Sequence, residues 1–171
     1  TIMAERIANL GYLGLVKEST KGTPLTPTDY VPLYKETLDT DIDLVEDNPI
    51  FGNKFARFQA LQGQRSHKGT LEVMAEPNTA GRFLDMLLTK GTTTGAGPYT
   101  HPFTLSGATD PKSYTVDISY GNIVARFWGV EASKITPKFD KNELHFDVAV
   151  SALGSFTGRQ IATISTITLT L

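Results

Sequence analysis

Polar and apolar residues alternate strictly from Ser113 to Tyr120, near the middle of the 171-residue chain. Successive side chains of a β-strand point to opposite faces, so the apolar residues of this run share one face. Gly121-Asn122 follows, a pair that favours the positive φ angles of a two-residue hairpin turn. Ile123–Trp128 then returns to an extended pattern. The sequence therefore predicts a half-buried β-hairpin whose first strand buries Tyr114, Val116, Ile118 and Tyr120.

Further strand signals surround this hairpin. Val130–Phe139, a turn at 140–142 and an alternating run at 144–151 predict a second hairpin. The end of the chain alternates threonine with Ile167, Leu169 and Leu171, which predicts another strand. Shorter β-like runs precede these hairpins, at Gly11–Lys17, Asp29–Tyr34 and Lys68–Met74.

One helix, Asn78–Lys90, is predicted among the strands. Pro77 precedes it, Asn78 or Thr79 can cap it, and Gly91 supplies a C-terminal stop. Its apolar positions recur at helical spacing and predict a core-facing stripe of Phe83, Leu84, Leu87 and Leu88. The chain is thus expected to be mostly β (α+β), with one flanking helix, and its length fits a single domain over residues 1–171.

Residues 45–67 show no clear core pattern. A structureless stretch of about 20 residues is uncommon inside a compact domain, and it usually marks a functional loop or one ordered by a partner. Aromatic and basic side chains interleave in it, as they do on platforms for single-stranded nucleic acid. In a chain with a net negative charge we expect instead that the aromatic side chains anchor in a pocket of a neighbour. These residues are Phe51, Lys54, Phe55, Arg57 and Phe58.

The composition and the absence of known motifs argue against most kinds of catalytic and metal-binding site. Cysteine is absent, which removes disulfides, thiolate zinc sites and cysteine nucleophiles. The three histidines, His67, His101 and His145, lack metal-binding spacing, and no G-x-S-x-G elbow or Walker motif is present. We therefore expect no catalytic, cofactor-binding or metal site and no enzyme activity.

The net charge and the hydropathy of the sequence argue against tight binding to nucleic acid and against insertion into a membrane. Lys and Arg number 16 against 18 Asp and Glu, and the formal charge of -2 gives no global attraction for nucleic acid. No window approaches the roughly 20 apolar residues of a membrane-spanning helix, so membrane insertion is not expected.

Asp39, Asp41 and Asp43 stand at every second position. They superficially match the start of a calcium-binding EF-hand loop, but Leu44 occupies the glycine position and Ile50 the position of the bidentate glutamate. A strand explains them better, because it places all three carboxylates on one face. That face is either an acidic functional stripe or an ordinary solvated surface.

Several short patterns, taken in chain order, resemble the tail tube proteins of long-tailed bacteriophages. The opening of that family is matched by Gly11–Glu18, Lys21–Pro24 and Tyr30–Leu33. The order then continues with the polar loop, the strand His67–Val73, the helix from Asn78, Tyr99–Thr104, the hairpin at Gly121-Asn122 and Trp128–Val130.

This resemblance implies a structural virion protein with a tail-tube-like β-sandwich or barrel and one flanking helix. Six copies would close into a ring with a continuous inner β-barrel, and rings would stack into a hollow tube that delivers DNA to the host. The loop at about 45–67 would bridge subunits or rings. On this basis Asp39, Asp41 and Asp43 are candidates for lining the lumen.

The resemblance also implies the partners and the place of assembly. The chain would bind copies of itself in a homo-hexamer and would meet the tape measure, tail terminator and distal tail proteins. Double-stranded DNA would pass transiently and without sequence preference. The protein would form part of the virion tail after assembly in the bacterial cytoplasm of the host.

Two alternatives remain open from the sequence. One is another virion β-protein: a capsid decoration protein, a head-tail connector or the tube of a contractile machine. The other is a small ligand-binding β-sandwich, which an exposed aromatic pocket without self-association would favour.

Overall fold

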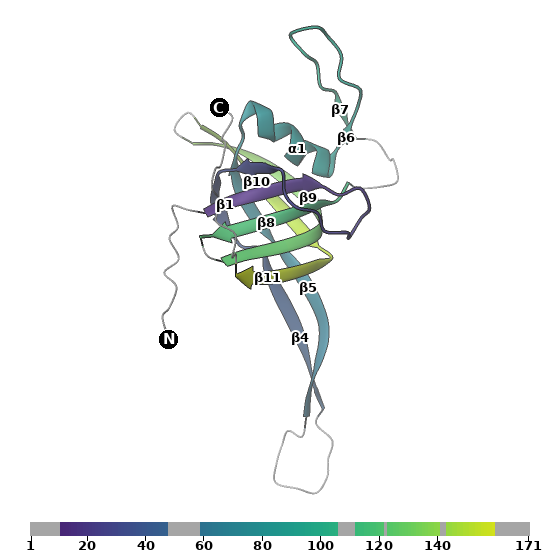
Figure 1. Cartoon of the computed structure of the whole chain (residues 1–171), viewed down its shortest axis with the longest axis vertical. Coiled ribbons are helices and arrows are strands. Elements are labelled where there is room, and N and C mark those ends of the chain that lie inside the picture. Colours follow the sequence, from purple (N-terminus) through teal and green to yellow (C-terminus); the bar gives the residue numbers. More distant parts are fainter. Residues whose placement is uncertain (1–10, 48–58, 106–111, 122, 141–142, 160–171) are drawn as a thin grey trace, which may run out of the picture.

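The computed structural model describes residues 11–47, 59–105, 112–121, 123–140 and 143–159 (Figure 1). Within them the chain forms mostly β-strands and one helix. The strands are β1 (Gly11–Lys17), β2 (Asp29–Val31), β3 (Leu33–Glu36), β4 (Asp39–Asp47), β5 (Gln59–Met74), β6 (Thr89–Lys90), β7 (Phe103–Thr104), β8 (Tyr114–Tyr120), β9 (Ile123–Asp140), β10 (Glu143–Ala152) and β11 (Gly154–Arg159), and the helix is α1 (Pro77–Leu87).

The long strand β9 joins two layers of antiparallel sheet (Figure 1). Its first part pairs with β8 and β11, and together with β1 and β2 they form what we call the front layer. Its second part pairs with β10, which pairs with β5, and β3 and β4 follow one another along the far side of β5. We call this second group the back layer.

The core lies between the two layers. The apolar positions of each alternating strand point inward, and Leu13, Val116, Leu71 and Val148 have no exposed surface. The predicted hairpins 113–128 and 130–151 are both present, with Gly121 at φ 84° in the first turn. The predicted runs Ile123–Trp128 and Val130–Phe139 form one continuous strand, in which Gly129 adopts φ 63° at a β-bulge.

The helix is shorter than predicted and turned relative to the expected stripe. It ends at Leu87, and Thr89 and Lys90 form β6 instead. Phe83 is fully buried as expected, and Leu84 and Leu88 are half-buried, but Leu87 is 40% exposed. The buried face carries Met86 and Asp85 in its place. The apolar pattern of the sequence did not predict this orientation, because a charged residue such as Asp85 is not expected on a buried helix face.

The expected loop at residues 45–67 is strand at both of its described ends. Residues 45–47 belong to β4 and residues 59–67 to β5, and the two strands pair along a long hairpin arm (Figure 1). The arm is exposed on both sides, so no apolar-polar alternation is imposed on it. The candidate residues Phe51, Lys54, Phe55, Arg57 and Phe58 lie outside the described residues, as does the predicted strand at the end of the chain. No helix in the described part of the chain is long and apolar enough to cross a membrane.

Candidate assembly surface

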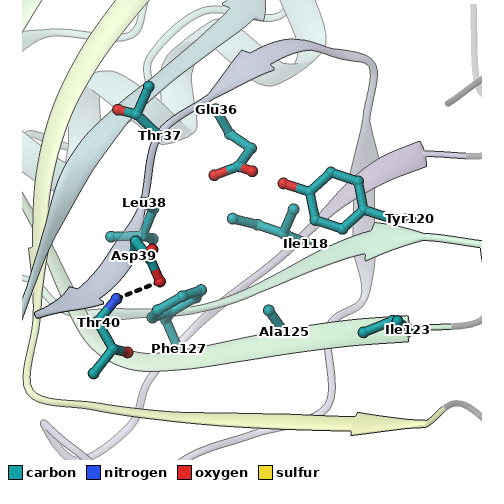
Figure 2. A pocket seen from close by; sticks show the side chains of 10 residues that line it. All are labelled: Glu36, Thr37, Leu38, Asp39, Thr40, Ile118, Tyr120, Ile123, Ala125 and Phe127. Atoms are coloured by element: carbon teal, nitrogen blue, oxygen red, sulfur yellow. Dashed lines mark hydrogen bonds between the residues drawn. The ribbon is translucent and has the colours of Figure 1, made fainter. Parts of the chain in front are cut away.

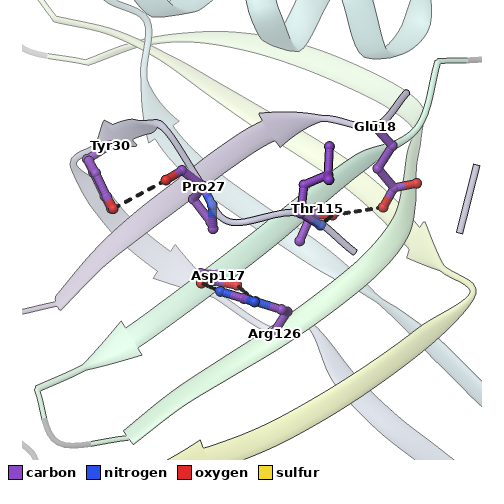
Figure 3. Close-up of polar contacts among 7 residues, drawn as sticks. Glu18, Pro27, Tyr30, Thr115, Asp117 and Arg126 are labelled. Atoms are coloured by element: carbon purple, nitrogen blue, oxygen red, sulfur yellow. Dashed lines mark hydrogen bonds and ion pairs between the residues drawn. The ribbon is translucent and has the colours of Figure 1, made fainter. Parts of the chain in front are cut away.

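A buried carboxylate, that of Glu18, fixes the outer side of the front layer (Figure 3). It accepts hydrogen bonds from the hydroxyls of Ser113 (2.7 Å) and Thr115 (2.9 Å), and from the backbone N–H groups of Gly129 and Gly22 (2.8 Å each). Burial opposes the charged form, but these donors outweigh it and hold the pKa of Glu18 below its ordinary value. Glu18 therefore ties the turn at Gly22 and the bulge at Gly129 to β8.

The segment that follows Glu18 covers this outer side. Leu25 donates its backbone N–H to the Thr115 hydroxyl (3.1 Å), and the Tyr30 hydroxyl donates to the Pro27 carbonyl (3.4 Å). Pro27 packs so close to Gly14 that a Cβ there would lie 2.9 Å from its side chain. Beside this segment Arg126 donates two hydrogen bonds of 2.7 Å to the carboxylate of Asp117 (Figure 3). The segment thus covers β1 and β8 on the outward face of the front layer, whereas Phe156 of β11, opposite Arg126, is 64% exposed.

Asp85 anchors the helix in the same way. Its buried carboxylate accepts hydrogen bonds from the amines of Lys17 (2.8 Å) and Lys112 (3.0 Å) and from the Tyr114 hydroxyl (2.8 Å). Burial alone would raise the pKa of Asp85, but the two lysines and the tyrosine lower it. Burial and the carboxylate together raise the pKa of Tyr114. The carboxylate stays charged near neutral pH and links α1 to β1 and β8.

The outward face of the back layer is polar and mostly open to solvent, apart from His145, which is buried beside the ring of Tyr34. Small side chains are spread over it, among them Ser66, Thr70, Thr136, Ala149 and Ser151. Lys138 forms an ion pair with Asp147 across β9 and β10. Carboxylates outnumber lysines on this face: Asp39, Asp41, Asp43, Glu72, Glu143 and Asp147 against Lys35, Lys68, Lys134 and Lys138.

The three predicted aspartates extend this face onto the arm. Asp39 lies opposite Lys68 and Asp41 opposite Ser66. The register then shifts, because Ile42 pairs with Arg65 and Leu44 with Gln62, so the extra residue belongs to β5. Since β4 itself carries no bulge, Asp39, Asp41 and Asp43 share one face and are exposed. Whether that face lines a lumen stays a prediction.

The arm also exposes apolar side chains. Thr40 joins the arm to the front layer, because its hydroxyl is 3.0 Å from that of Ser155 in β11 and 2.8 Å from Nδ1 of His67 in β5. Beyond that point Ile42, Leu44, Val45 and Leu61 are 41–62% exposed. Ile42 and Leu44 lie on one face of the arm, and Val45 and Leu61 lie on the other. A two-stranded hairpin is marginal by itself in water, and exposed apolar side chains on both of its faces indicate contact surfaces. These four residues, which we call the arm cluster, were missed in the sequence because the segment lacked a core pattern.

A groove opens between the two layers, near the turn of the β8–β9 hairpin (Figure 2). Its volume is about 310 Å³. The inward face of the front layer forms one wall, and the β3–β4 connection forms the other. Figure 2 shows Glu36 and Tyr120 directed toward one another across it. The apolar lining consists of Leu38, Ile118, Ile123, Ala125 and Phe127.

The described residues offer no metal centre. No three His, Cys, Asp or Glu side chains converge among them. His67 contacts Thr40, and Nδ1 of His101 lies 2.9 Å from the Thr93 hydroxyl. The ring of His145 packs against that of Tyr34, with centroids 4.4 Å apart.

Comparison with known proteins agrees with this arrangement. A family model described as phage tail tube protein matches residues 8–171. A chain of the six-fold symmetrised baseplate of the anti-feeding prophage superposes with a TM-score of 0.59 at 11% identity, covering 91% of this chain and 97% of that one. A chain of the sheath–tube complex of the extracellular contractile injection system PVC, in its extended state, gives 0.55 at 13% identity and covers 88% of both chains. Identities this low show the shared fold alone. No curated protein sequence matches the chain.

Proposed function

Because the chain belongs to the phage tail tube protein family, we propose that six copies of it close into a ring and that the rings stack into the hollow tube of a phage tail. Its role is that of a structural component of the virion tail. In this proposal the tube conducts double-stranded DNA to the host, and the chain catalyses no reaction. Assembly takes place in the host cytoplasm before the virion is released.

The observation that carries the proposal is the contrast between the two outward faces. The segment after Glu18 covers β1 and β8 of the front layer, whereas no described segment lies over most of the back layer, which is polar. A protein that surrounds a water-filled bore needs such an uncovered polar face, because DNA and its counterions must move along it. We assign the back layer to the lumen and the covered front layer to the body of the ring.

The charge of the bare face suits passage rather than binding. A row of several Lys or Arg contacts would hold DNA through counterion release. Here carboxylates outnumber lysines, and at least one lysine is engaged in an ion pair with Asp147. Repeated six times around a ring and again along the tube, the face would repel phosphate weakly and without sequence preference.

The hairpin arm supplies the contact between subunits. Its exposed apolar residues need a partner surface, and a second copy is the partner that self-assembly provides. Free strand edges in a monomer invite pairing with another chain, and a closed ring removes them. At the two ends of the tube, the tape measure, tail terminator and distal tail proteins would take the place of further copies.

Electron microscopy of the purified full chain, together with sedimentation at increasing concentration, tests the proposal. We expect hollow tubes built from six-fold rings. Monomers at every concentration, or closed shells, would contradict it.

A further inference from the structure

We infer that the end of the chain, residues 160–171, inserts as an extra strand into the groove of a neighbouring subunit. The inference rests on the proposed self-assembly and names one contact that would hold the ring together. The groove is the site lined by Leu38, Ile118, Ile123, Ala125 and Phe127.

The groove has the form of a strand-addition site. Its apolar wall is a sheet surface, formed by Ile118, Ala125 and Phe127 on the inward face of the front layer. Its other wall is the β3–β4 connection, and β3 and β4 pair with β5 on one side only within the described part of the chain. The backbone N–H of Thr40 donates to the side chain of Asp39 at 2.7 Å, not to a strand (Figure 2). A strand edge beside an apolar surface binds an extended segment through main-chain hydrogen bonds and alternate side chains.

The end of the chain has the matching sequence. Residues 160–171 have no charged side chain, so burying their side chains leaves no unpaired ion. Ile167, Leu169 and Leu171 alternate with threonines, which allows one face to meet the apolar wall and the other to meet solvent. The opposite end of the chain, residues 1–10, is a poorer match because it contains Glu5 and Arg6 and does not alternate.

The segment starts beside the groove. β11 ends at Arg159, which pairs with Ile123, a residue of the groove. Twelve residues follow in the sequence, and at about 3.3 Å per residue they would span roughly 40 Å when extended.

The direction of β11 favours a neighbour over the same chain. β11 contacts Thr40 at Ser155 and then runs away from it toward Ile123, so entering its own groove would require a tight reversal directly after Arg159. The residues at that point, Gln160 to Thr163, include no Gly, Pro, Asn or Asp, which tight turns favour. A segment that fits a different surface of the next copy gives a head-to-tail contact, and such contacts form a ring when the rotation between successive copies closes.

Disulfide trapping tests the inference, and the absence of native cysteine makes every crosslink attributable. The full-length variant Ala125→Cys/Leu169→Cys is assembled, oxidised mildly and run on a non-reducing gel. We expect a ladder of covalently joined subunits that collapses to one band on reduction. The matched control Ala125→Cys/Thr168→Cys places the second thiol on the opposite face and should give at least a several-fold weaker ladder.

Other outcomes would overturn the inference. A disulfide within single chains would show that the segment fills its own groove, and tubes without any disulfide would show that it binds elsewhere. If the first pair does not assemble, Ile123→Cys/Leu171→Cys repeats the test at the edge of the groove. Failure of the parent chain to form tubes would count against the proposed function, whereas parent tubes with a negative crosslink would count against this inference alone.

Discussion

At the scale of single residues, the fold depends on two buried carboxylates that hold elements together from outside the apolar core. Glu18 joins the end of β1 to β8 and to the Gly129 bulge, and Asp85 joins α1 to Lys17 and Lys112. Neither was identified in the sequence, because a single acidic residue in a loop or helix carries no periodic signal. Asp85 left one trace, since it interrupts the otherwise apolar run from Phe83 to Leu88.

These carboxylates predict how stability depends on pH. The ordinary pKa values are 4.5 for Glu18 and 3.8 for Asp85, and folding lowers both. A lowered pKa adds stability above the unfolded-state value, and this stability is lost as pH falls through the folded-state value. The free energy of unfolding, measured with urea, should therefore be nearly constant from pH 7 to about 5 and fall below about 4.5.

The variant Glu18→Gln tests the assignment to Glu18. It leaves buried donors without a charged acceptor and should lower the free energy of unfolding at pH 7 by about 1–3 kcal/mol, with a shallower fall in acid. The exposed Asp41→Asn is the control and should match the parent. An unchanged acid profile in Glu18→Gln would refute the role of this carboxylate.

At the scale of elements, the sequence predicted the strands along which apolar and polar side chains alternate. The hairpins were predictable because apolar and polar side chains alternate along their strands and Gly121-Asn122 marks the turn. The prediction that Tyr114–Tyr120 is half-buried was wrong, since both faces of β8 are buried. The strand through Asp39, Asp41 and Asp43 was also predicted, but the rest of the arm, residues 45–47 and 59–67, was not, because both of its faces are exposed and no periodicity is imposed. The groove was also beyond reach, since it is formed by Leu38 and Phe127, residues far apart in the chain that meet only when the two layers pack.

The revised orientation of α1 predicts opposite outcomes at neighbouring positions. Met86 is 1% exposed, and Met86→Asp would bury an unpaired carboxylate, costing several kcal/mol and leaving the subunit unfolded or insoluble. Leu87→Asp is the matched control at a position that is 40% exposed, and it should change the melting temperature little. Thermal melts of both variants decide the matter, and equal destabilisation would contradict the orientation.

The arm cluster predicts a separation of folding from assembly. Replacing Leu44, Val45 and Leu61 together by serine removes apolar surface that is 50–62% exposed in the single chain. The melting temperature of the subunit should stay close to that of the parent, while sedimentation should show loss of polymer. Gln62→Ser, on the same arm, should polymerise normally. Normal tubes from the triple variant would mean that the arm makes no essential contact.

At the scale of the whole molecule, the proposed tube subunit has a covered outward face, an acidic outward face open to solvent and an arm with exposed apolar side chains. In the assembled tube, the charge on the outward face of the back layer would set the charge of the bore. Replacing Asp39, Asp41 and Asp43 by lysine should leave the fold nearly intact, because exposed substitutions usually change stability by within about 0.5 kcal/mol each. In virions with this tube, DNA ejection should become slower at low salt and recover as salt is raised. Ejection at the parental rate at low salt would place the aspartates away from the DNA path.

The most direct measurement is a helical reconstruction by electron cryo-microscopy of tubes assembled from the purified full chain. The account predicts six subunits per ring, the back layer facing the lumen, and Asp39, Asp41 and Asp43 along the bore. A map with the back layer on the outer wall, or with the covered front layer lining the lumen, would contradict it.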